Sequence, residues 1–160
     1  MHKSIAASSV AIQSLTGSSE VDSDSVDTAQ VFIADSIMLH IRAEIASGTP
    51  STATITWALQ ESVDGSTDWE AAVDNTGTTI GATVNVKTLA TDIYARVEGV
   101  NAAVTDTDVN PSGGRLRYLR VALTPAFTGG SSPAILAYAE FIGVPANGQL
   151  MPVRTTTSNT

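Results

Sequence analysis

The residues able to perform acid–base chemistry or to bind a metal are few in this chain. Its 160 residues include two histidines, His2 and His40, and no cysteine, which excludes thiolate zinc sites, iron–sulfur clusters and cysteine nucleophiles. His40 stands between Met38 and Arg42 in an alternating segment, where a surface or interface histidine is the ordinary interpretation. The chain has no G-x-S-x-G motif, and a Ser-His-Asp triad needs a base that an acid orients. We therefore expect no catalytic residue, no cofactor and no metal ligand, and we expect that the protein is not an enzyme.

The acidic segment 20–27, with the sequence EVDSDSVD, is a candidate calcium site. An EF-hand loop needs carboxylates at its first, third and fifth positions, Gly at the sixth and Glu at the twelfth. Counted from Asp22 the twelfth position is Ile33, and counted from Glu20 it is Val31. Both registers fail, so a solvated acidic segment is the preferred interpretation.

Four further acids, Glu61, Asp64, Asp68 and Glu70, flank a turn signal at Asp64-Gly65. A glycosidase needs two carboxyl groups that face each other across a cleft, one of them with a raised pKa. Four acids on one exposed turn do not provide that arrangement. We expect the side chain of Asp64 to accept hydrogen bonds from the backbone of its own turn.

The charge balance excludes nucleic acid as an expected partner. Eight Lys and Arg residues stand against sixteen Asp and Glu residues, which gives a net charge of −8, whereas nucleic-acid binding normally needs a basic surface that displaces counterions. An anionic membrane surface is disfavoured for the same reason. Arg115, Arg117 and Arg120 form a local basic cluster, and at this net charge we expect them to make salt bridges between subunits.

No segment is expected to cross a membrane or to act as a signal peptide. The uncharged run 4–19 is rich in Ser and Gly and lacks a continuous apolar stretch. The uncharged run 121–139 has the length of a bilayer span, but Pro and Gly residues interrupt it at a turn. We expect a soluble protein that is made in the cytoplasm.

The composition favours strands as the elements that must position any site. The chain contains 17 Ser and 21 Thr, with 42% hydrophobic and only 15% charged residues. Thr, Val and Ile suit the half-buried surface of a sheet, and residues that favour helices are scarce. A low charge and a mean hydropathy of +0.12 argue against disorder of the whole chain. The expected fold class is all-β.

Alternation of apolar and polar residues predicts four longer strands, at 36–45, 52–60, 116–123 and 135–144. A short connector that contains Gly and Pro joins the first two strands, and a connector rich in Gly and Ser joins the last two. We interpret each pair as an antiparallel hairpin.

Weaker alternation at 83–89 and 92–100 predicts two shorter strands, and 101–114 is a long loop. About six or seven strands at such spacing predict a single antiparallel β-sandwich or jelly roll. The domain is expected to cover residues 31–144. Its predicted core consists of the inward apolar members of the strands, namely Ile37, Leu39, Ile41, Ile55, Trp57, Leu59, Val97, Leu119 and Val121.

Both ends of the chain are expected to lie outside this domain. Residues 1–30 carry only scattered apolar positions and are predicted to be an extended N-terminal arm that a partner orders, and residues 145–160 an extended C-terminal tail. Strand 135–144 is apolar on both faces, as expected where a neighbouring chain covers it. The predicted interface residues are Ile5, Val10, Ile12 and Leu15 on the arm and Tyr138 and Ile142 on this strand.

Two sequence segments resemble those of a known protein family: TATITWALQESVDGSTDWEAA at 52–72 and LRYLRVALTPAFTGGSSPAILAYAEFIG at 116–143. They resemble small head proteins of tailed bacteriophages, in particular the cement or decoration proteins that bind outside the major capsid protein shell. The shared features are a strand ending in LQES, the DGST turn before Trp69, and a late RYLRV strand before a turn rich in Gly and Ser. The resemblance covers about residues 31–144.

This resemblance implies a β-sandwich or jelly roll, usually a trimer, that sits where capsomers meet and stabilises the DNA-filled head. The implied partners are the major capsid protein and further copies of the chain, and the implied location is the capsid exterior of the virion after synthesis in the host cytoplasm. Two alternatives stay open. One is another phage structural module, such as a tail or baseplate domain, and the other is a carbohydrate-binding or adhesin-like β-sandwich.

Overall fold

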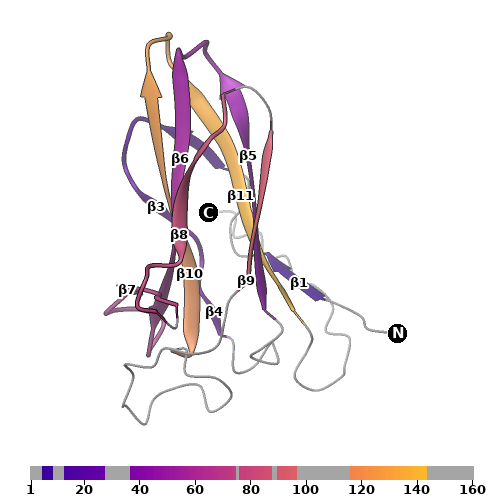
Figure 1. The fold of residues 1–160 in the computed structure, drawn as a ribbon, viewed down its shortest axis with the longest axis vertical. Helices are drawn as coiled ribbons and strands as arrows, with labels where there is room; N and C mark the ends of the chain where they lie inside the picture. The colour runs from indigo at the N-terminus through magenta and orange to yellow at the C-terminus, as the bar shows by residue number, and fades with distance from the viewer. Residues whose placement is uncertain are drawn as a thin grey trace, which may run out of the picture.

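The computed structural model describes residues 5–8, 13–27, 37–74, 76–87, 90–96 and 116–143. These residues form strands, turns and connecting segments without any helix, so the described part of the chain offers no helix capable of crossing a membrane. Two antiparallel sheets pack face to face and give an elongated body (Figure 1). The predicted all-β sandwich is therefore confirmed.

Sheet A has the strand order β1–β11–β5–β9, and β2 also pairs with β11. All its pairings are antiparallel. Its members are β1 (Ile5–Ser8), β2 (Gln13–Thr16), β5 (Met38–Ser47), β9 (Thr91–Arg96) and β11 (Ala134–Gly143).

Sheet B has the order β3–β10–β6–β7, with β4 also on β10 and β8 also on β6. Its longest pairing joins β10 and β6 over eleven residues, from Tyr118 opposite Ser62 to Thr128 opposite Thr52. Its members are β3 (Val21–Asp22), β4 (Val26–Asp27), β6 (Thr52–Ser62), β7 (Glu70–Ala71), β8 (Gly81–Asn85) and β10 (Tyr118–Thr128).

The strand pairs are nested along the chain. β6 pairs with β8, and outside them in the sequence β5 pairs with β9. Further out, β3 and β4 pair with β10, and β1 and β2 pair with β11. Two sheets built from such nested antiparallel pairs form a jelly roll, so of the two predicted architectures the structure has the jelly roll.

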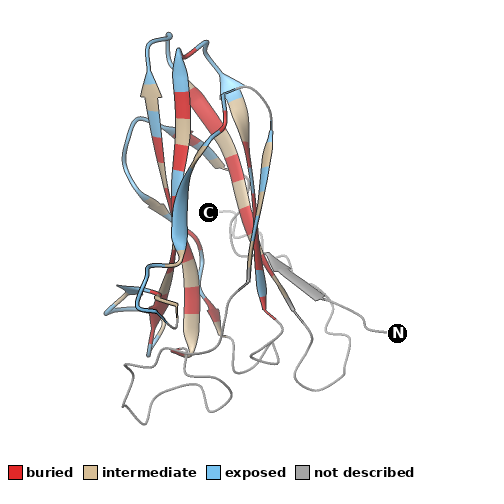
Figure 2. Ribbon diagram, viewed as in Figure 1, coloured by how far each residue is buried: buried red, intermediate tan, exposed pale blue. Residues whose placement is uncertain are grey.

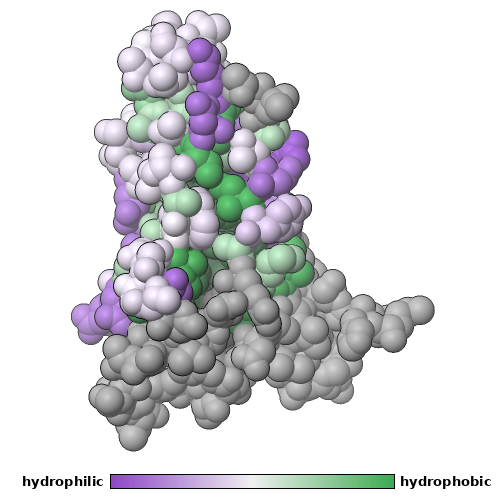
Figure 3. Space-filling model, in the orientation of Figure 1, coloured by the Kyte–Doolittle hydropathy of each residue, from purple (hydrophilic) through white to green (hydrophobic). Residues whose placement is uncertain are grey.

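The core lies between the sheets and follows the alternation of the sequence. Along β6 the residues Ile55, Trp57 and Leu59 are buried, and the residues between them face outward (Figure 2). Of the nine predicted core residues, Ile37, Leu39, Ile41, Ile55, Trp57, Leu59, Leu119 and Val121 are buried, and Val97 lies outside the described residues. On the face drawn in Figure 3, apolar side chains gather along the middle, between β8 and β9.

The predicted pairing of neighbouring strands is wrong. β5 lies in sheet A and β6 in sheet B, and β10 and β11 are divided in the same way. Each connector therefore crosses between the sheets, which pack about 10 Å apart. The two connectors lie against each other, Gly48 in the first and Pro133 in the second. The approach is so close that a Cβ added to Gly48, whose φ is +74°, would lie 2.8 Å from Pro133 Cα. The alternation of apolar and polar residues shows which side chains are buried. It is the same whether the next strand pairs in the same sheet, as in a hairpin, or crosses to the other sheet, so it cannot predict the pairing.

The described part of the segment 1–30 belongs to the jelly roll, and this corrects the expected separate arm. β1 and β2 extend sheet A beside β11, and β3 and β4 extend sheet B beside β10. Between β3 and β4, the Ser23 N–H donates to Val121 O and the Val121 N–H donates to Ser23 Oγ, both at 2.9 Å. Short strands with few apolar residues suffice here because backbone hydrogen bonds to an existing strand hold them. The tail 145–160 lies outside the described residues.

Candidate functional site on the outer face of sheet A

Three neighbouring strands place a polar cluster on the outer face of sheet A. In the register of the sheet, His40 on β5 lies opposite Tyr94 on β9 and Glu140 on β11. The next outward position of β5, Arg42, lies opposite Asp92 and Tyr138. Side chains of directly opposed residues lie within contact distance, so these six residues, His40, Arg42, Asp92, Tyr94, Tyr138 and Glu140, form one group that we call the His40 cluster.

Both ring nitrogens of His40 face carboxylates. Nδ1 lies 2.8 Å from Glu140 Oε1, and Nε2 lies 3.0 Å from Asp92 Oδ1. A neutral imidazole has a single N–H and would turn a lone pair toward one of these carboxylates, whereas an imidazolium donates to both. The geometry therefore fits the protonated form of His40, although the residue is only 8% exposed.

Two tyrosines enclose the imidazole ring. The ring of Tyr94 stacks on it with 4.5 Å between centroids and an interplanar angle of 7°, and Tyr138 meets it edge-on at 5.6 Å. The Tyr138 hydroxyl donates to Glu140 Oε1 at 3.0 Å and lies 3.2 Å from His40 Nδ1. The imidazole is thus fixed in both position and orientation.

The charges of the cluster shift its ionisation equilibria. Burial alone would lower the pKa of His40, but the hydrogen bonds and charges of Glu140 and Asp92 outweigh it and raise this pKa. The hydrogen bond from His40, with the charge of Arg42, lowers the pKa of Asp92. Burial, followed by the Glu140 carboxylate, raises the pKa of Tyr138. The shifts of His40 and Asp92 favour a charged imidazolium beside an ionised Asp92, and the shift of Tyr138 favours its neutral hydroxyl.

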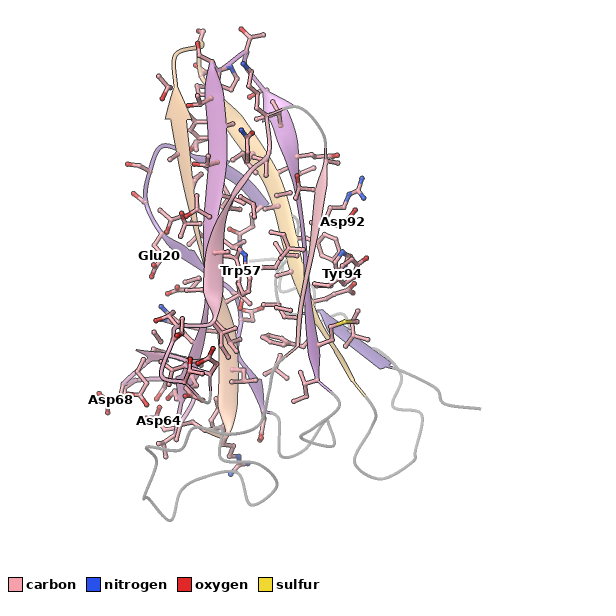
Figure 4. The ribbon with its side chains drawn as sticks, in the orientation of Figure 1. Glu20, Trp57, Asp64, Asp68, Asp92 and Tyr94 are labelled. Carbon is pink, nitrogen blue, oxygen red and sulfur yellow. The ribbon has the colours of Figure 1, made fainter. Side chains whose placement is uncertain are left out.

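The cluster is also the most exposed aromatic surface of the described chain. Tyr94 is 61% exposed and Met38, on the same face, is 37% exposed, and these are two of the three exposed large hydrophobic residues described. Figure 4 shows Asp92 and Tyr94 on β9, pointing away from sheet B. A shallow depression of about 180 Å³ lies beside Tyr138, lined by Arg42, Glu44, Leu136, Ala137 and Tyr138.

The structure distributes the predicted interface residues over different places. Tyr138 and Ile142 lie on the outer face of sheet A, where both are partly exposed. Leu15, on β2, is only 2% exposed and belongs to the core, so its predicted place at an interface is corrected. It is buried because its pairing opposite Ile135 directs it toward sheet B. The backbone of Ile5 pairs with Gly143, and Val10 and Ile12 lie outside the described residues.

Arg117 makes its salt bridge within the chain. Its Nε and NH2 groups donate to the two carboxylate oxygens of Asp27 at 3.0 and 2.7 Å, and its guanidinium lies 5.2 Å from the ring centroid of Tyr118. The bidentate pair holds the end of β4 against β10 and raises the pKa of Arg117. Arg115 lies outside the described residues.

Arg120 has a similar environment on the outer face of sheet B. Its guanidinium lies 4.3 Å from the ring centroid of Trp69, its Nε donates to Gln60 Oε1 at 2.7 Å, and NH1 lies 3.0 Å from Asp22 Oδ2. The expectation of salt bridges between subunits is therefore corrected for Arg117 and Arg120. Both arginines are used to attach β3 and β4, so Asp22 and Asp27 of the acidic segment are paired rather than only solvated.

The turn after β6 behaves as the sequence predicts. Asp64 Oδ1 accepts hydrogen bonds from the backbone N–H groups of Ser66 and Thr67 at 2.8 and 2.9 Å. These bonds, and those from the hydroxyls of the same residues, lower the pKa of Asp64 well below its ordinary value. Asp64 and Asp68 lie on the opposite side of the molecule from Asp92 and Tyr94 of the His40 cluster (Figure 4). Asp64 therefore stabilises the turn. The expectation of four acids on one exposed turn is wrong for Glu61, which is fully buried and whose Oε2 accepts a hydrogen bond from the Leu116 N–H at 3.1 Å.

The His40 cluster was missed by sequence reasoning, which placed His40 on a polar face without partners. The available signal was that Asp92, Tyr94, Tyr138 and Glu140 also occupy the polar positions of their strands. Alternation cannot show that β9, β5 and β11 are neighbours, and without that order the residues cannot be brought together. Across the described ranges, no three or more His, Asp or Glu side chains are arranged to hold a metal ion.

No protein-family model and no curated protein matches the chain. Among solved structures, the chain is similar to one from "Structure of infectious bursal disease virus Gx strain", with 13% sequence identity and a TM-score of 0.41. The match covers 94% of this chain and 33% of that chain, so this chain spans a third of the other's length.

Proposed function

We propose that the protein is a structural component of a virion, a cement protein that binds the outside of a major capsid protein shell at capsomer junctions and stabilises the DNA-filled head. The observation that carries the proposal is the outer face of sheet A. Tyr94 and Met38 are exposed there on a rigid two-sheet scaffold, and the His40 cluster holds Tyr94 in place. An exposed aromatic surface held in one geometry is typical of a binding face.

The two sequence segments that resemble phage head proteins, 52–72 and 116–143, support the proposal. They correspond to β6 with its Asp64 turn and to the β10–β11 crossing, which supply central strands to both sheets. In this proposal the chain has no enzymatic role, its partners are the capsid shell and further copies of itself in a trimer, and it binds neither nucleic acid nor membrane. Its net charge of −8 agrees with a protein partner.

Binding of the purified protein to expanded empty capsids of the virus that encodes it tests the proposal. We expect co-sedimentation with the capsids, and we expect negative-stain images of virions lacking the protein to lose density at capsomer junctions. Ultracentrifugation of the protein alone should show a trimer. Absence of binding to expanded capsids, with density retained on virions that lack the protein, would contradict the proposal.

A carbohydrate-binding module is the second candidate, and the exposure of Tyr94 is the observation that favours it. A tyrosine ring that is 61% exposed, flat against its supporting imidazole and surrounded by polar side chains offers a platform for a sugar ring. A glycan array separates the two candidates, because a capsid cement should leave the array unlabelled.

A further inference from the structure

Strand β9 forms one edge of sheet A, as Figure 1 shows. It pairs with β5 along its whole length, Thr91–Arg96. Outside this pairing, the described backbone of Ile93, Tyr94 and Ala95 makes no further hydrogen bond. A strand edge of this kind presents N–H and C=O groups to which another strand can add.

This edge carries none of the features that usually keep two strands from pairing. Proteins protect exposed edges with Lys, Pro, bulges or inward-pointing charges. The sequence of β9, TDIYAR, contains neither Lys nor Pro, and its pairing with β5 shows no register shift. Its inward residues, Ile93 and Ala95, are apolar and only partly buried against the core. An added strand therefore buries apolar surface and also pairs the free backbone groups.

The sequence of β9 is complementary to itself in one antiparallel register. When Tyr94 stands opposite Tyr94 of a second copy, Ile93 comes opposite Ala95 and Asp92 comes opposite Arg96. Directly opposed residues lie on the same face of an antiparallel sheet. An aromatic pair thus occupies the centre, apolar residues meet apolar residues, and acidic positions meet basic ones, which are the pairings that stabilise antiparallel strands.

The other antiparallel registers are less favourable. A shift by one residue joins the outer face of one sheet to the inner face of the other. A shift by two residues places either Asp92 or Arg96 opposite Tyr94 and removes both pairs of opposite charge. A shift by four residues places Asp92 opposite Asp92 or Arg96 opposite Arg96, and like charges in direct opposition are destabilising. The charges of β9 therefore select a second copy of the same strand in a single register.

We propose that β9 is a docking edge for a second copy of this chain, which pairs antiparallel with it about a two-fold axis at Tyr94, so that sheet A continues from one copy into the next. The proposal does not rest on the cement function. A two-fold contact closes at two copies, so the proposed trimer uses a different interface, and on a shell β9 would join one trimer to its neighbour. The backbone edge is used, and the outer face of sheet A stays exposed.

The contact is expected to be weak in dilute solution. Five residues on each side are far fewer than the roughly 20–30 that stable interfaces use. Such a contact forms chiefly where copies are held close together, because a high effective concentration replaces intrinsic affinity. The experiment must therefore trap the pairing rather than rely on a stable dimer.

Cysteine cross-linking of the full chain traps it, and the chain contains no cysteine of its own. Tyr94→Cys places two thiols directly opposite each other, within reach of a disulfide. The matched control is Thr83→Cys, because Thr83 is an exposed, outward position of β8, which pairs only with β6 among the described strands. We expect Tyr94→Cys to form disulfide-linked dimers at least about tenfold faster than Thr83→Cys. Equal rates would overturn the proposal.

A mixture of Asp92→Cys and Arg96→Cys chains tests the register. We expect disulfide-linked dimers in the mixture and not in either variant alone, because equivalent residues then lie four positions, or about 13 Å, apart along the strands. Linkage of Asp92→Cys alone at the rate of the mixture would contradict the proposed register. If Tyr94→Cys does not keep the native circular dichroism spectrum, this mixture decides the question.

A charge substitution tests the contact without a cross-link. Arg96→Glu places an acid opposite Asp92 twice in each pair of copies, and Arg96→Lys keeps the opposite charges. In sedimentation equilibrium at rising concentration, we expect Arg96→Glu to weaken the concentration-dependent step about three- to tenfold and Arg96→Lys to follow the wild type. Equal association of Arg96→Glu and the wild type would overturn the proposal. None of these measurements uses capsids, so failure of the cement function leaves their outcome unchanged.

Discussion

The two nitrogens of His40 face carboxylates on two different strands, which makes the stability of sheet A depend on pH. β9 and β11 do not pair with each other, and β5 lies between them. The imidazolium joins Asp92 of β9 to Glu140 of β11 across β5. When the proton leaves, one of the two contacts places a lone pair against a carboxylate, and that contact becomes repulsive.

The raised pKa of His40 sets the direction of this pH dependence. Because the folded-state pKa lies above that of the unfolded chain, about 6.5, the stabilisation is fully present below about pH 6.5 and is lost as pH rises through the folded pKa. We predict that the free-energy advantage of the wild type over His40→Gln falls between about pH 5.5 and about pH 8.5. Urea unfolding at both pH values measures it. A constant difference, or an NMR titration of the ring that places its pKa below the ordinary value, would contradict the prediction.

Ser62 is the residue on which the turn after β6 depends most. It is fully buried, its Oγ accepts from the N–H groups of Asp64 and Gly65 at 3.2 and 3.1 Å, and it lies 2.7 Å from Thr67 O. Ser62→Ala removes the buried hydroxyl that bonds these partly buried backbone groups, and we expect the free energy of unfolding to fall by about 1–3 kcal/mol.

Ser66→Ala in the same turn is the matched control for that substitution. Ser66 is exposed and its Oγ donates only to Asp64 Oδ2, at 3.0 Å, so we expect a change within about 0.5 kcal/mol. Thermal unfolding followed by circular dichroism compares the two variants. Equal effects of the two substitutions would show that Ser62 does not organise the turn.

At the scale of the elements, the sequence predicts strands and burial better than it predicts neighbours. The alternation of β5, β6, β10 and β11 correctly predicts which residues form the core, because a two-residue period directly reflects a sheet with one buried face. It does not distinguish a turn that returns within one sheet from a crossing to the other sheet. The candidate site depends on this missing information, since His40, Asp92 and Glu140 meet only when β9, β5 and β11 are adjacent.

The segment 1–30 shows a second limit of sequence reasoning. Leu15 is one apolar residue among small polar ones, and such a pattern resembles that of a disordered arm. In the fold, β2 pairs with β11 and places Leu15 in the core, where a single large side chain per short strand is sufficient. Sparse apolar positions thus have different meanings at the edge of an existing sheet and in a free segment.

Substitution of Leu15 tests whether β2 belongs to the domain. Leu15→Ala removes a side chain that is 2% exposed and packed in the core cluster, so we expect a loss of about 2–5 kcal/mol in the free energy of unfolding. Ser14→Ala, on the exposed face of the same strand, should change it by less than about 0.5 kcal/mol. Urea denaturation of the isolated protein measures both, and a negligible effect of Leu15→Ala would restore the separate arm.

For the whole molecule, the nested topology couples the two ends of the described chain. β11 pairs with β1, β2 and β5, and β10 pairs with β3, β4 and β6. Both late strands therefore lie between an early strand and a central one, and neither sheet is complete until β10 and β11 have been added. Most of the stabilising contacts join residues far apart in sequence, which predicts slow folding for a domain of this size. The pairing of β11 with strands on both of its sides also gives the outer face of sheet A a rigid support.

The final prediction concerns the electrostatics of docking. If an acidic chain with a net charge of −8 docks through the outer face of sheet A onto a positively charged partner surface, salt must screen both the long-range attraction and the exposed part of the contact. We expect the affinity of the wild type for expanded capsids to fall several-fold between about 50 mM and about 500 mM NaCl, chiefly through a slower association rate. Glu140→Gln should show a weaker salt dependence because one of the attracting charges is absent, whereas Thr83→Ala, an exposed position on sheet B, should follow the wild type. Surface plasmon resonance on immobilised capsids measures both rates, and an association rate that does not change with salt would show that the docking face is recognised by shape and apolar contact rather than by charge.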